Sequence, residues 1–346
     1  MTKILLTGGS GFIAAHILDQ LLAQGHTVVT TVRSEAKAAK IRAAYPSQAE
    51  SGALTVAIVP DIAREDAFEE VVKNTPGLEV VLHTASPFHF KFTDPKTELV
   101  DPAIVGTTSI LKSVAQYAPT VRRVVVTSSF AAILDEARAG DPATVFSEAS
   151  WNPVTIDDIH RNPPTAYRAS KKLAEKAAWE FVKDNNKFEL VTINPPMVFG
   201  PLAPGQAVES LDGINTSNQR IVDLLQGKWK NAVPEVGVAW IWVDVRDVAA
   251  AHVKAGLDVK EAAGKRLFVT AGEYSNAELG KIVRKNFPEY AEQVPEDSAL
   301  AVGEKPPADK RYRFDNSETN KLLGISYRTF EESIVDTVKS LKKLGA

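Results

Sequence analysis

Short apolar runs alternate with longer amphipathic stretches over the first 200 residues of the chain. Runs such as Val124-Val125-Val126 are nearly continuous and β-branched, which is typical of strands covered on both faces. We expect strands at 4–6, 27–32, 54–59, 80–82, 123–126 and 189–193, and helices at 12–24, 36–44, 65–72, 102–117 and 166–184. Strands separated by helices imply right-handed crossovers. The pattern therefore predicts an α/β fold with a doubly wound parallel sheet.

The second half of the chain is less regular, with a cluster of prolines from Pro195 to Pro204. Here we expect helices at 218–226, 245–257, 276–286 and 330–344, strands at 240–243 and 266–269, and a loop at 294–310. This organisation predicts a first domain of residues 1–194, to which residues 238–272 return. Residues 195–237 and 273–346 are expected to form a smaller, mixed region.

Composition narrows the class of protein. The 346 residues are 44% apolar and 24% charged, as in soluble globular proteins. A net charge of −3 gives no electrostatic case for binding nucleic acid or an anionic membrane. No cysteine is present, so disulfides and thiol chemistry are excluded. No targeting segment precedes the first strand, and we expect a cytoplasmic protein that binds no metal, since His83 and His89 are too few for a metal site.

A glycine turn joins the first strand to the first helix, with Gly8, Gly11 and Ala14 at a Gly-x-x-Gly-x-x-Ala spacing. Gly8 allows a tight turn, Gly11 lets the backbone approach a pyrophosphate, and Ala14 lets the helix pack closely on the strand. The start of the helix also offers free N–H groups and a positive dipole. The turn predicts a Rossmann-type dinucleotide site that includes Gly8, Ser10, Gly11, Phe12 and Ile13.

The end of the second strand indicates which dinucleotide is bound. An NAD-binding unit usually carries an acidic residue there, but this chain has Thr31-Val32-Arg33-Ser34. Arg33 is suited to a 2′-phosphate, and Lys37 adds a further donor. We therefore expect NADP(H) as the cofactor. Asp61 and Ile62, after the third strand, are interpreted either as adenine contacts or as a helix cap.

Tyr167 and Lys171 lie four residues apart in a predicted helix and so share one face. An ammonium beside a phenol stabilises the phenolate, so we expect a Tyr167 pKa below the usual value of about 10 and a proton donor that works near neutral pH. Ser128 and Ser129 end the fifth strand, at the edge where ligands bind. A hydroxyl there can hold a carbonyl oxygen beside Tyr167, although serine is also common in turns.

Together these motifs resemble the extended short-chain dehydrogenase/reductases. The resemblance is strongest to the branch of fungal NADPH-dependent methylglyoxal and carbonyl reductases, which are similar to plant dihydroflavonol and cinnamoyl-CoA reductases. It covers nearly the whole chain and rests on segments 7–14, 83–88, 127–129, 151–153, 167–171, 174–179, 194–201, 243–249 and 321–325.

The resemblance implies roles for the site residues. Tyr167 gives its proton to the carbonyl oxygen, Lys171 lowers the Tyr167 pKa and binds the nicotinamide ribose, and Ser129 rather than Ser128 polarises the substrate. The backbone from Pro195 to Val198 borders the nicotinamide. Further cofactor contacts are expected at Thr84, Ala85, Ser86, Thr127, Pro195 and Val198. The family usually has an asparagine where this chain has Val105.

The substrate pocket is predicted to be apolar and to include Phe88, Phe130 and Met197. A carboxylate or diphosphate left unpaired there would be unfavourable, so we expect a neutral small-molecule carbonyl substrate: an aldehyde, an α-dicarbonyl or a ketone. Two other functions remain open, a nucleotide-sugar epimerase or dehydratase on the same fold and a non-catalytic NADPH-binding regulator. The protein is expected to be a monomer or a homodimer.

Overall fold

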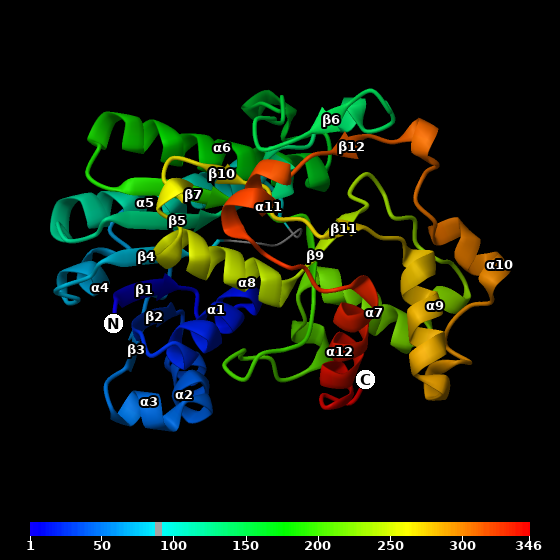
Figure 1. Cartoon of the computed structure of the whole chain (residues 1–346), viewed down its shortest axis with the longest axis horizontal. Helices are drawn as coiled ribbons and strands as arrows, with labels where there is room; N and C mark the ends of the chain where they lie inside the picture. The colour runs from blue at the N-terminus through cyan, green and yellow to red at the C-terminus, as the bar shows by residue number, and fades with distance from the viewer. Residues whose placement is uncertain (87–91) are drawn as a thin grey trace.

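The computed structural model of the chain describes residues 1–86 and 92–346. Its largest element is a seven-stranded, wholly parallel sheet in the order β10-β7-β5-β4-β1-β2-β3 (Figure 1). The strands are β1 (Lys3–Thr7), β2 (Thr27–Val32), β3 (Leu54–Ile58), β4 (Val80–His83), β5 (Arg123–Thr127), β7 (Glu189–Ile193) and β10 (Arg266–Leu267). The strand order reverses between β1 and β4, and ligands bind at such a reversal in doubly wound sheets.

Helices cover both faces of this sheet, as the continuous apolar runs predict. On one face, Leu6 and Val28 pack with Leu18 of α1 and Val248 of α8. On the other, Leu5 and Val124 pack with residues of α4, α5 and α6. The helices of this part of the chain are α1 (Phe12–Ala23), α2 (Glu35–Ala44), α3 (Pro46–Glu50), α4 (Glu69–Lys73), α5 (Asp101–Tyr117), α6 (Pro163–Asn185) and α8 (Val245–Val253).

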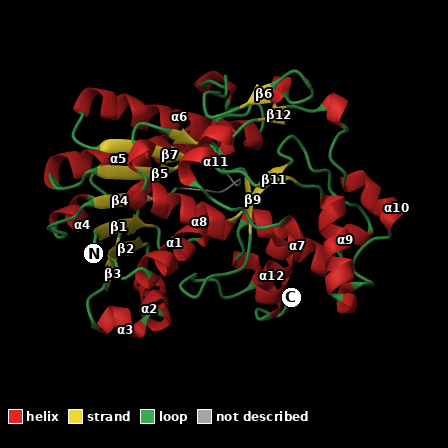
Figure 2. Ribbon diagram, in the orientation of Figure 1, coloured by secondary structure: helices red, strands yellow, loops and turns green. Residues whose placement is uncertain are grey.

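The remaining elements pack beyond the carboxyl ends of the large sheet (Figure 2). They include the sheet β11-β9-β8 and the pair β12-β6. Their core is aromatic: Trp240 stacks on Tyr312 at 4.5 Å between ring centroids, and Tyr274 lies 5.2 Å from Phe199. The elements are β6 (Val145–Phe146), β8 (Met197–Phe199), β9 (Ile241–Asp244), β11 (Gly272–Glu273), β12 (Arg313–Phe314), α7 (Thr216–Leu225), α9 (Asn276–Asn286), α10 (Asp297–Leu300), α11 (Ser317–Leu323) and α12 (Phe330–Lys342).

Three predicted elements differ clearly from the structure, and one of them, the strand expected at 266–269, is only Arg266–Leu267. The helix expected at 65–72 is reduced to α4, because polar side chains before it form local turns: Asp61 accepts from the Ala63 N–H at 2.8 Å, and Arg64 pairs with Asp66. The loop expected at 294–310 contains the short helix α10. Strands β6, β8, β11 and β12 have two or three residues each, too few to show a period in the sequence.

Within the part of the chain that the structure describes, no helix is both long and apolar enough to cross a bilayer.

An ion pair between the buried Arg123 and the exposed Glu189 joins β5 and β7 at their amino ends. Arg123 is 2% exposed and donates to Glu189 from Nε at 2.9 Å and from Nη2 at 2.7 Å. Its remaining donors reach the carbonyl oxygens of Ala255, Val259 and Lys260. The guanidinium of Arg123 is therefore hydrogen-bonded to one carboxylate and three backbone carbonyls at this end of the sheet, as a buried charge requires.

The turn between β1 and α1 packs against Ala85, which follows β4, and against Thr30 of β2. Gly8 has φ +77°, a backbone angle that favours glycine, and a Cβ there would also lie in tight contact with Ala85 Cα, at 3.2 Å. A Cβ on Gly9 would lie 2.1 Å from Thr30 Oγ1 on β2. The sequence spacing indicated the role of Gly8 but not that of Gly9, whose constraint comes from a neighbouring strand.

We therefore predict that Gly9→Ala lowers the free energy of unfolding by about 1–3 kcal/mol through overpacking. Thr30→Ala removes the atoms that clash but also a 2.8 Å hydrogen bond to the Leu6 carbonyl. In a double-mutant cycle followed by urea unfolding, the two changes together should destabilise less than the sum of the single changes. Additive effects would contradict the contact.

Candidate active site

The carboxyl ends of β1 and β4 are tied together beside the glycine turn. Thr7 Oγ1, at the end of β1, accepts from the backbone N–H groups of Thr84 and Ala85, both at 3.1 Å. The Thr84 hydroxyl donates in return to the Thr7 carbonyl at 2.7 Å. Thr84, Ala85 and Ser86 therefore leave β4 next to Gly8, which is where the sequence predicts them to contact a dinucleotide.

Helix α1 begins at this turn without a side-chain cap. Its N-cap is Gly11, whose N–H donates to the Gly8 carbonyl at 2.8 Å. The first turn of α1 carries no acidic residue, and Ala14 is buried against the sheet. The predicted contacts Ser10, Phe12 and Ile13 stand around this helix start, where backbone N–H groups and the helix dipole favour an anion.

Arg33 follows β2 directly, in the position that the sequence assigns to it. It is exposed, and within residues 1–86 and 92–346 it makes no hydrogen bond or ion pair. Lys37, one turn into α2, has its pKa lowered by partial burial and by the nearby Arg33. Among the described residues neither of these two cations beside the end of β2 forms an ion pair, whereas Lys40 pairs with Glu209 and Arg42 pairs with Glu35.

Asp61 follows β3 and caps a local turn through the Ala63 N–H. This arrangement favours the capping interpretation of Asp61. The adenine contact of Asp61 and Ile62 stays a prediction.

Helix α6 presents the tyrosine and lysine from its first turns. Asn162 caps the helix by accepting from the Thr165 N–H at 2.8 Å, and Pro163 occupies the first helical position. The side chains of Tyr167 and Ser129 are hydrogen-bonded to each other. Lys171 donates from Nζ to Ser86 Oγ at 2.8 Å. The structure therefore brings the three predicted catalytic residues together and adds Ser86 of the β4 end as the partner of Lys171.

The structure also separates the roles of the two adjacent serines. Ser128 is 7% exposed, and its hydroxyl donates to Glu175 at 2.5 Å. Ser129 is partly exposed, and its Oγ accepts from the Ala131 N–H at 3.1 Å besides its bond with Tyr167. Ser129 is thus the serine that borders Tyr167, as the resemblance implies.

One electrostatic expectation is wrong in this structure. Burial raises the pKa of Tyr167, and the hydrogen bond with Ser129 only partly opposes that effect. Burial also lowers the pKa of Lys171 to about 8. The Lys171 Nζ lies 5.8 Å from the centre of the Tyr167 ring, so the ammonium does not offset the desolvation of the phenol.

The predicted residues at the ends of β5 and β7 lie side by side. The Phe130 N–H donates to the Pro195 carbonyl at 2.9 Å, so the Pro195 segment runs next to Ser129. The Thr127 hydroxyl is hydrogen-bonded to His252 at 2.7 Å. Val198 lies in β8 and is buried. Their contacts with a cofactor stay predictions.

The predicted pocket residues have different surroundings. Phe130 is 2% exposed, and its ring stacks on Phe268 at 5.2 Å and lies 6.0 Å from Phe146. This placement favours a packing role for Phe130. Met197 is partly exposed at the start of β8, and Phe88 lies outside the described residues.

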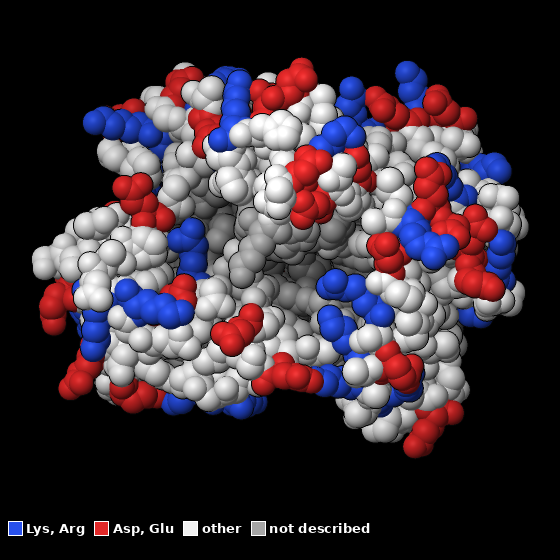
Figure 3. Space-filling model, turned by 180° about the vertical axis from the view of Figure 1, so that it is seen from behind, with Lys and Arg blue, Asp and Glu red and all other residues white. Residues whose placement is uncertain are grey.

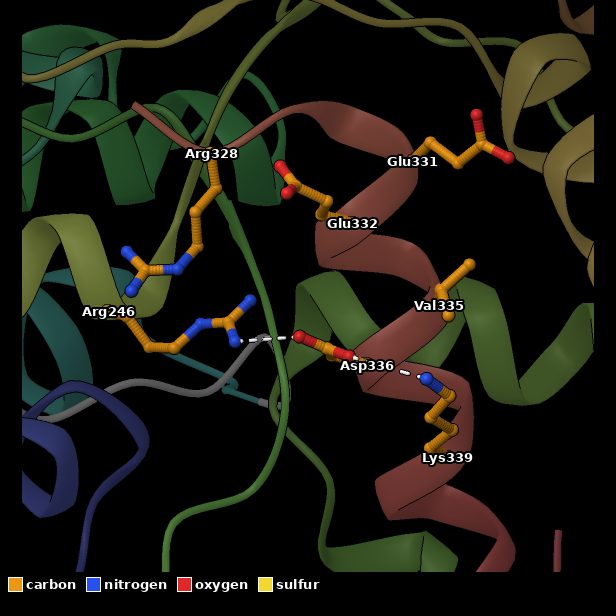
Figure 4. A pocket seen from close by; sticks show the side chains of 7 residues that line it. All are labelled: Arg246, Arg328, Glu331, Glu332, Val335, Asp336 and Lys339. Atoms are coloured by element: carbon orange, nitrogen blue, oxygen red, sulfur yellow. Dashed lines mark hydrogen bonds and ion pairs between the residues drawn. The ribbon is translucent and has the colours of Figure 1, made fainter. Parts of the chain in front are cut away.

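A separate surface cavity of about 350 Å³ lies between the start of α8 and helix α12 (Figure 4). Arg246 donates there to Asp244 and to Asp336, and Arg328 pairs with Asp247. Asp244 also caps α8 by accepting from the Arg246 N–H at 2.8 Å. The cations that line this cavity are therefore paired with carboxylates, and none of the three predicted catalytic residues lines it.

Glu175 is the residue of this site that sequence reasoning missed. It lies on α6, one turn beyond Lys171, and its side chain is buried. The available signal was its spacing: Tyr167, Lys171 and Glu175 recur every four residues and so share one helix face.

Comparison with known proteins agrees with this geometry. The sequence profile of the NAD dependent epimerase/dehydratase family matches residues 4–270. A ketoreductase of Aspergillus niger is 43% identical over 340 residues, with 98% of this chain and 97% of that protein covered. The NADPH-dependent methylglyoxal reductase of Saccharomyces cerevisiae is 37% identical over 351 residues, with 99% and 98% covered.

Solved structures extend the likeness to the whole fold. The structure of Gre2 from Candida albicans in complex with NADPH has a TM-score of 0.90 and 35% identity, and 100% of each chain is covered. A family profile that spans most of the chain, relatives that are alike over nearly their full length, and the same overall fold lead to one conclusion: the chain belongs to the NAD dependent epimerase/dehydratase family, within the extended short-chain dehydrogenase/reductases.

Proposed function

We propose that this protein is an NADPH-dependent carbonyl reductase that converts aldehydes, α-dicarbonyls or ketones to alcohols. The observation that carries the proposal is the hydrogen-bonded pair Ser129–Tyr167, with Lys171 one helical turn away. A reacting carbonyl oxygen placed between the two hydroxyls is polarised by one and protonated by the other. The names of the relatives, a ketoreductase and an NADPH-dependent methylglyoxal reductase, support the same reaction.

The residues around the glycine turn fit a phosphorylated dinucleotide. Gly8 and Gly9 let this turn pack closely against Ala85 and Thr30, which side chains at either position would disturb. The uncapped start of α1 suits a pyrophosphate, and Arg33 with Lys37 suits a 2′-phosphate. NADPH, when bound, supplies the hydride. Ser86, one of the predicted cofactor contacts, follows β4 and accepts a hydrogen bond from Lys171.

The chain's own residues perform the proton chemistry. Ser129 holds the carbonyl oxygen, and Tyr167 donates its proton to that oxygen as the alcohol forms. Burial keeps the Tyr167 phenol protonated near neutral pH, which suits a general acid. Lys171 is positioned by Ser86 to offer its ammonium to the ribose hydroxyls and to the developing phenolate.

The surroundings of the site support a neutral substrate. The residues that follow Ser129 are Phe130, Ala131 and Ala132, and Met197 stands on the neighbouring strand β8. Figure 3 shows a hollow in the middle of this face of the molecule, with a mainly uncharged floor and charged side chains at its rim. An acid or a diphosphate would find few partners on such a floor. We propose that Phe88 and Met197 contribute to the pocket, and that Phe130 supports it from the core.

The division of the chain follows from this proposal. Residues 1–194 and the returning 238–272 hold the cofactor and the catalytic groups, and residues 195–237 and 273–346 shape the substrate side. We propose that the protein acts in the cytoplasm, as a monomer or homodimer, and without nucleic acid.

The reaction is tested by NADPH absorbance decay with the unmodified protein and a panel of aldehydes, α-dicarbonyls and aryl ketones. We expect the highest kcat/KM with one of these neutral carbonyls. A higher value for a 2-keto acid would overturn the substrate class, and a higher value for a UDP-sugar would favour the epimerase or dehydratase alternative.

Tyr167→Phe is the matched variant for this assay, because it removes one hydroxyl and leaves the ring. We expect turnover to fall by about 2 to 4 powers of ten, the usual contribution of a general acid. NADPH affinity, measured by fluorescence titration, should change little. Activity within a few-fold of the parent would exclude Tyr167 as the proton donor.

Arg33→Ala should raise the KM for NADPH and leave that for NADH unchanged. A charged hydrogen bond to the 2′-phosphate contributes about 1.5–3 kcal/mol, which corresponds to about 10- to 150-fold. Arg42→Ala is the control, since it removes an exposed cation of α2 that is paired with Glu35. Equal effects of Arg33→Ala on the two cofactors would contradict a phosphate contact.

The pH dependence of kcat/KM for NADPH should report the ionisation of the Lys171 ammonium in the free enzyme. Its pKa of about 8 lies below the ordinary value, so its positive charge is lost as the pH rises through about 8. The raised pKa of Tyr167 keeps the phenol protonated in that range. We expect kcat/KM to fall above about pH 8, and Lys171→Arg to move this fall to higher pH because a guanidinium stays charged. An unchanged midpoint in Lys171→Arg would assign the ionisation to another group.

A further inference from the structure

Behind the catalytic residues lies a buried polar network centred on the carboxylate of Glu175. The side chain of Glu175 is fully buried and forms an ion pair with Arg266 of β10, at 2.6 Å from Arg266 Nε. Arg266 is held in turn by the carbonyls of Glu148 and Ser150 and lies 3.8 Å over the Trp151 ring. The carboxylate thus keeps a fixed cation beside it, as a buried charge requires.

The two oxygens of Glu175 bind donors from three different elements. Oε2 accepts from Ser128 Oγ at 2.5 Å and from Asn194 Nδ2 at 2.8 Å. Oε1 accepts from Thr192 Oγ1 at 3.0 Å and from Arg266 Nε at 2.6 Å. Ser128 follows β5, Thr192 belongs to β7, and Asn194 follows β7. One side chain of α6 therefore ties that helix to the carboxyl ends of both strands.

The network reaches a catalytic residue through Asn194. The Asn194 amide donates both to Glu175 Oε2 and to the backbone carbonyl of Ser129, the latter at 3.2 Å. Ser128, the other partner of Oε2, is the neighbour of Ser129 in the chain. Glu175 is thus connected to the Ser129 backbone in two ways, through Ser128 and through Asn194. The helix that contains Glu175 also carries Tyr167 and Lys171.

We propose that Glu175 is a positioning residue, which sets the distance between Ser129 on the β5 end and Tyr167 on α6 through Ser128 and Asn194. It touches no reacting atom. Its effect on the reaction comes from holding the two hydroxyls at hydrogen-bond distance, and a displacement of about 1 Å in such a pair can lower a rate by about 10²-fold. This inference rests on the proposed function for its kinetic test but not for its structural test.

Glu175→Gln is the sharpest change, because it keeps the shape of the side chain. Whichever way the new amide is turned, its NH₂ faces a group that can only donate, either Asn194 Nδ2 or Arg266 Nε. Turning the Asn194 amide instead would place its oxygen against the Ser129 carbonyl. The variant therefore has to break the link to Ser129 or the link to Arg266.

The matched control is Glu189→Gln. Glu189 pairs with the buried Arg123 and joins the same two strands, β5 and β7, at their opposite ends. This change also removes a carboxylate from a buried arginine, but far from the reacting groups. Ser128→Ala is a milder second variant, which removes only one donor from Glu175 and serves if Glu175→Gln fails to fold.

Steady-state kinetics with NADPH and the best neutral carbonyl give the first readout. We expect kcat to fall about 10- to 100-fold in Glu175→Gln and several-fold in Ser128→Ala, with little change in the KM for NADPH. Glu189→Gln should keep kcat within about two-fold of the parent, even where thermal unfolding shows that it is destabilised. An equal loss of kcat in Glu175→Gln and Glu189→Gln, or an unchanged kcat in Glu175→Gln and Ser128→Ala, would overturn the proposal.

A second readout needs no turnover. The protein is labelled with 3-fluorotyrosine, and the ¹⁹F resonance of residue 167 is assigned by its loss in Tyr167→Phe. We expect this resonance to shift in Glu175→Gln and Ser128→Ala and to stay in place in Glu189→Gln. An unmoved resonance in both network variants would overturn the proposal. If the unmodified protein reduces no carbonyl but the resonance shifts as expected, the proposed function fails and the positioning role stands.

Discussion

The meeting of parallel strand ends at one edge of the sheet is the constraint on which the site depends. All seven strands of the large sheet run in the same direction, so the ends of β1, β4, β5 and β7 lie together. Each of these ends contributes a polar group or a turn: Thr7 and Gly8, Ser86, Ser129, and Asn194. Helix α6 brings Tyr167 and Lys171 to this edge from its first turns.

Buried charges hold the two ends of the same strands in different ways. At the amino ends, Arg123 donates hydrogen bonds to Glu189 and to backbone carbonyls. This ion pair lies at the end of the strands opposite to Ser129. At the carboxyl ends, the pair of Glu175 and Arg266 is connected through Asn194 to Ser129. A buried ion pair of this kind adds little net stability compared with apolar packing.

Desolvation sets the electrostatics of the proposed catalytic residues Tyr167 and Lys171. Burial raises the pKa of Tyr167 and lowers that of Lys171 to about 8. Both shifts favour the neutral forms of these side chains, as expected where water is excluded. The hydrogen bonds from Ser129 to Tyr167 and from Lys171 to Ser86 act within that environment and orient the groups. This balance suits an acid that keeps its proton until a carbonyl oxygen takes it.

The sequence alone determined the architecture and the short-range motifs. Strands β2 and β7 and helix α9 were predicted at their observed bounds, and the other long elements within a few residues, because β-branched runs and helical periodicity are local properties. The glycine turn, the Tyr167–Lys171 spacing and Ser129 were equally readable, because each depends on residues close together in the chain. What the sequence could not give were relations between distant segments. Strands of two or three residues have no period, and they form only when a neighbouring strand is already in place.

Packing between distant segments decided the remaining features of the site. The need for glycine at position 9 arises from Thr30 on a neighbouring strand, and the burial of Phe130 arises from Phe268, 138 residues away (268 − 130). The raised pKa of Tyr167 depends on how completely the folded chain excludes water from the phenol, which no spacing in the sequence encodes. The same holds for Glu175, whose partners come from β5, β7 and β10 and meet only after the sheet has formed.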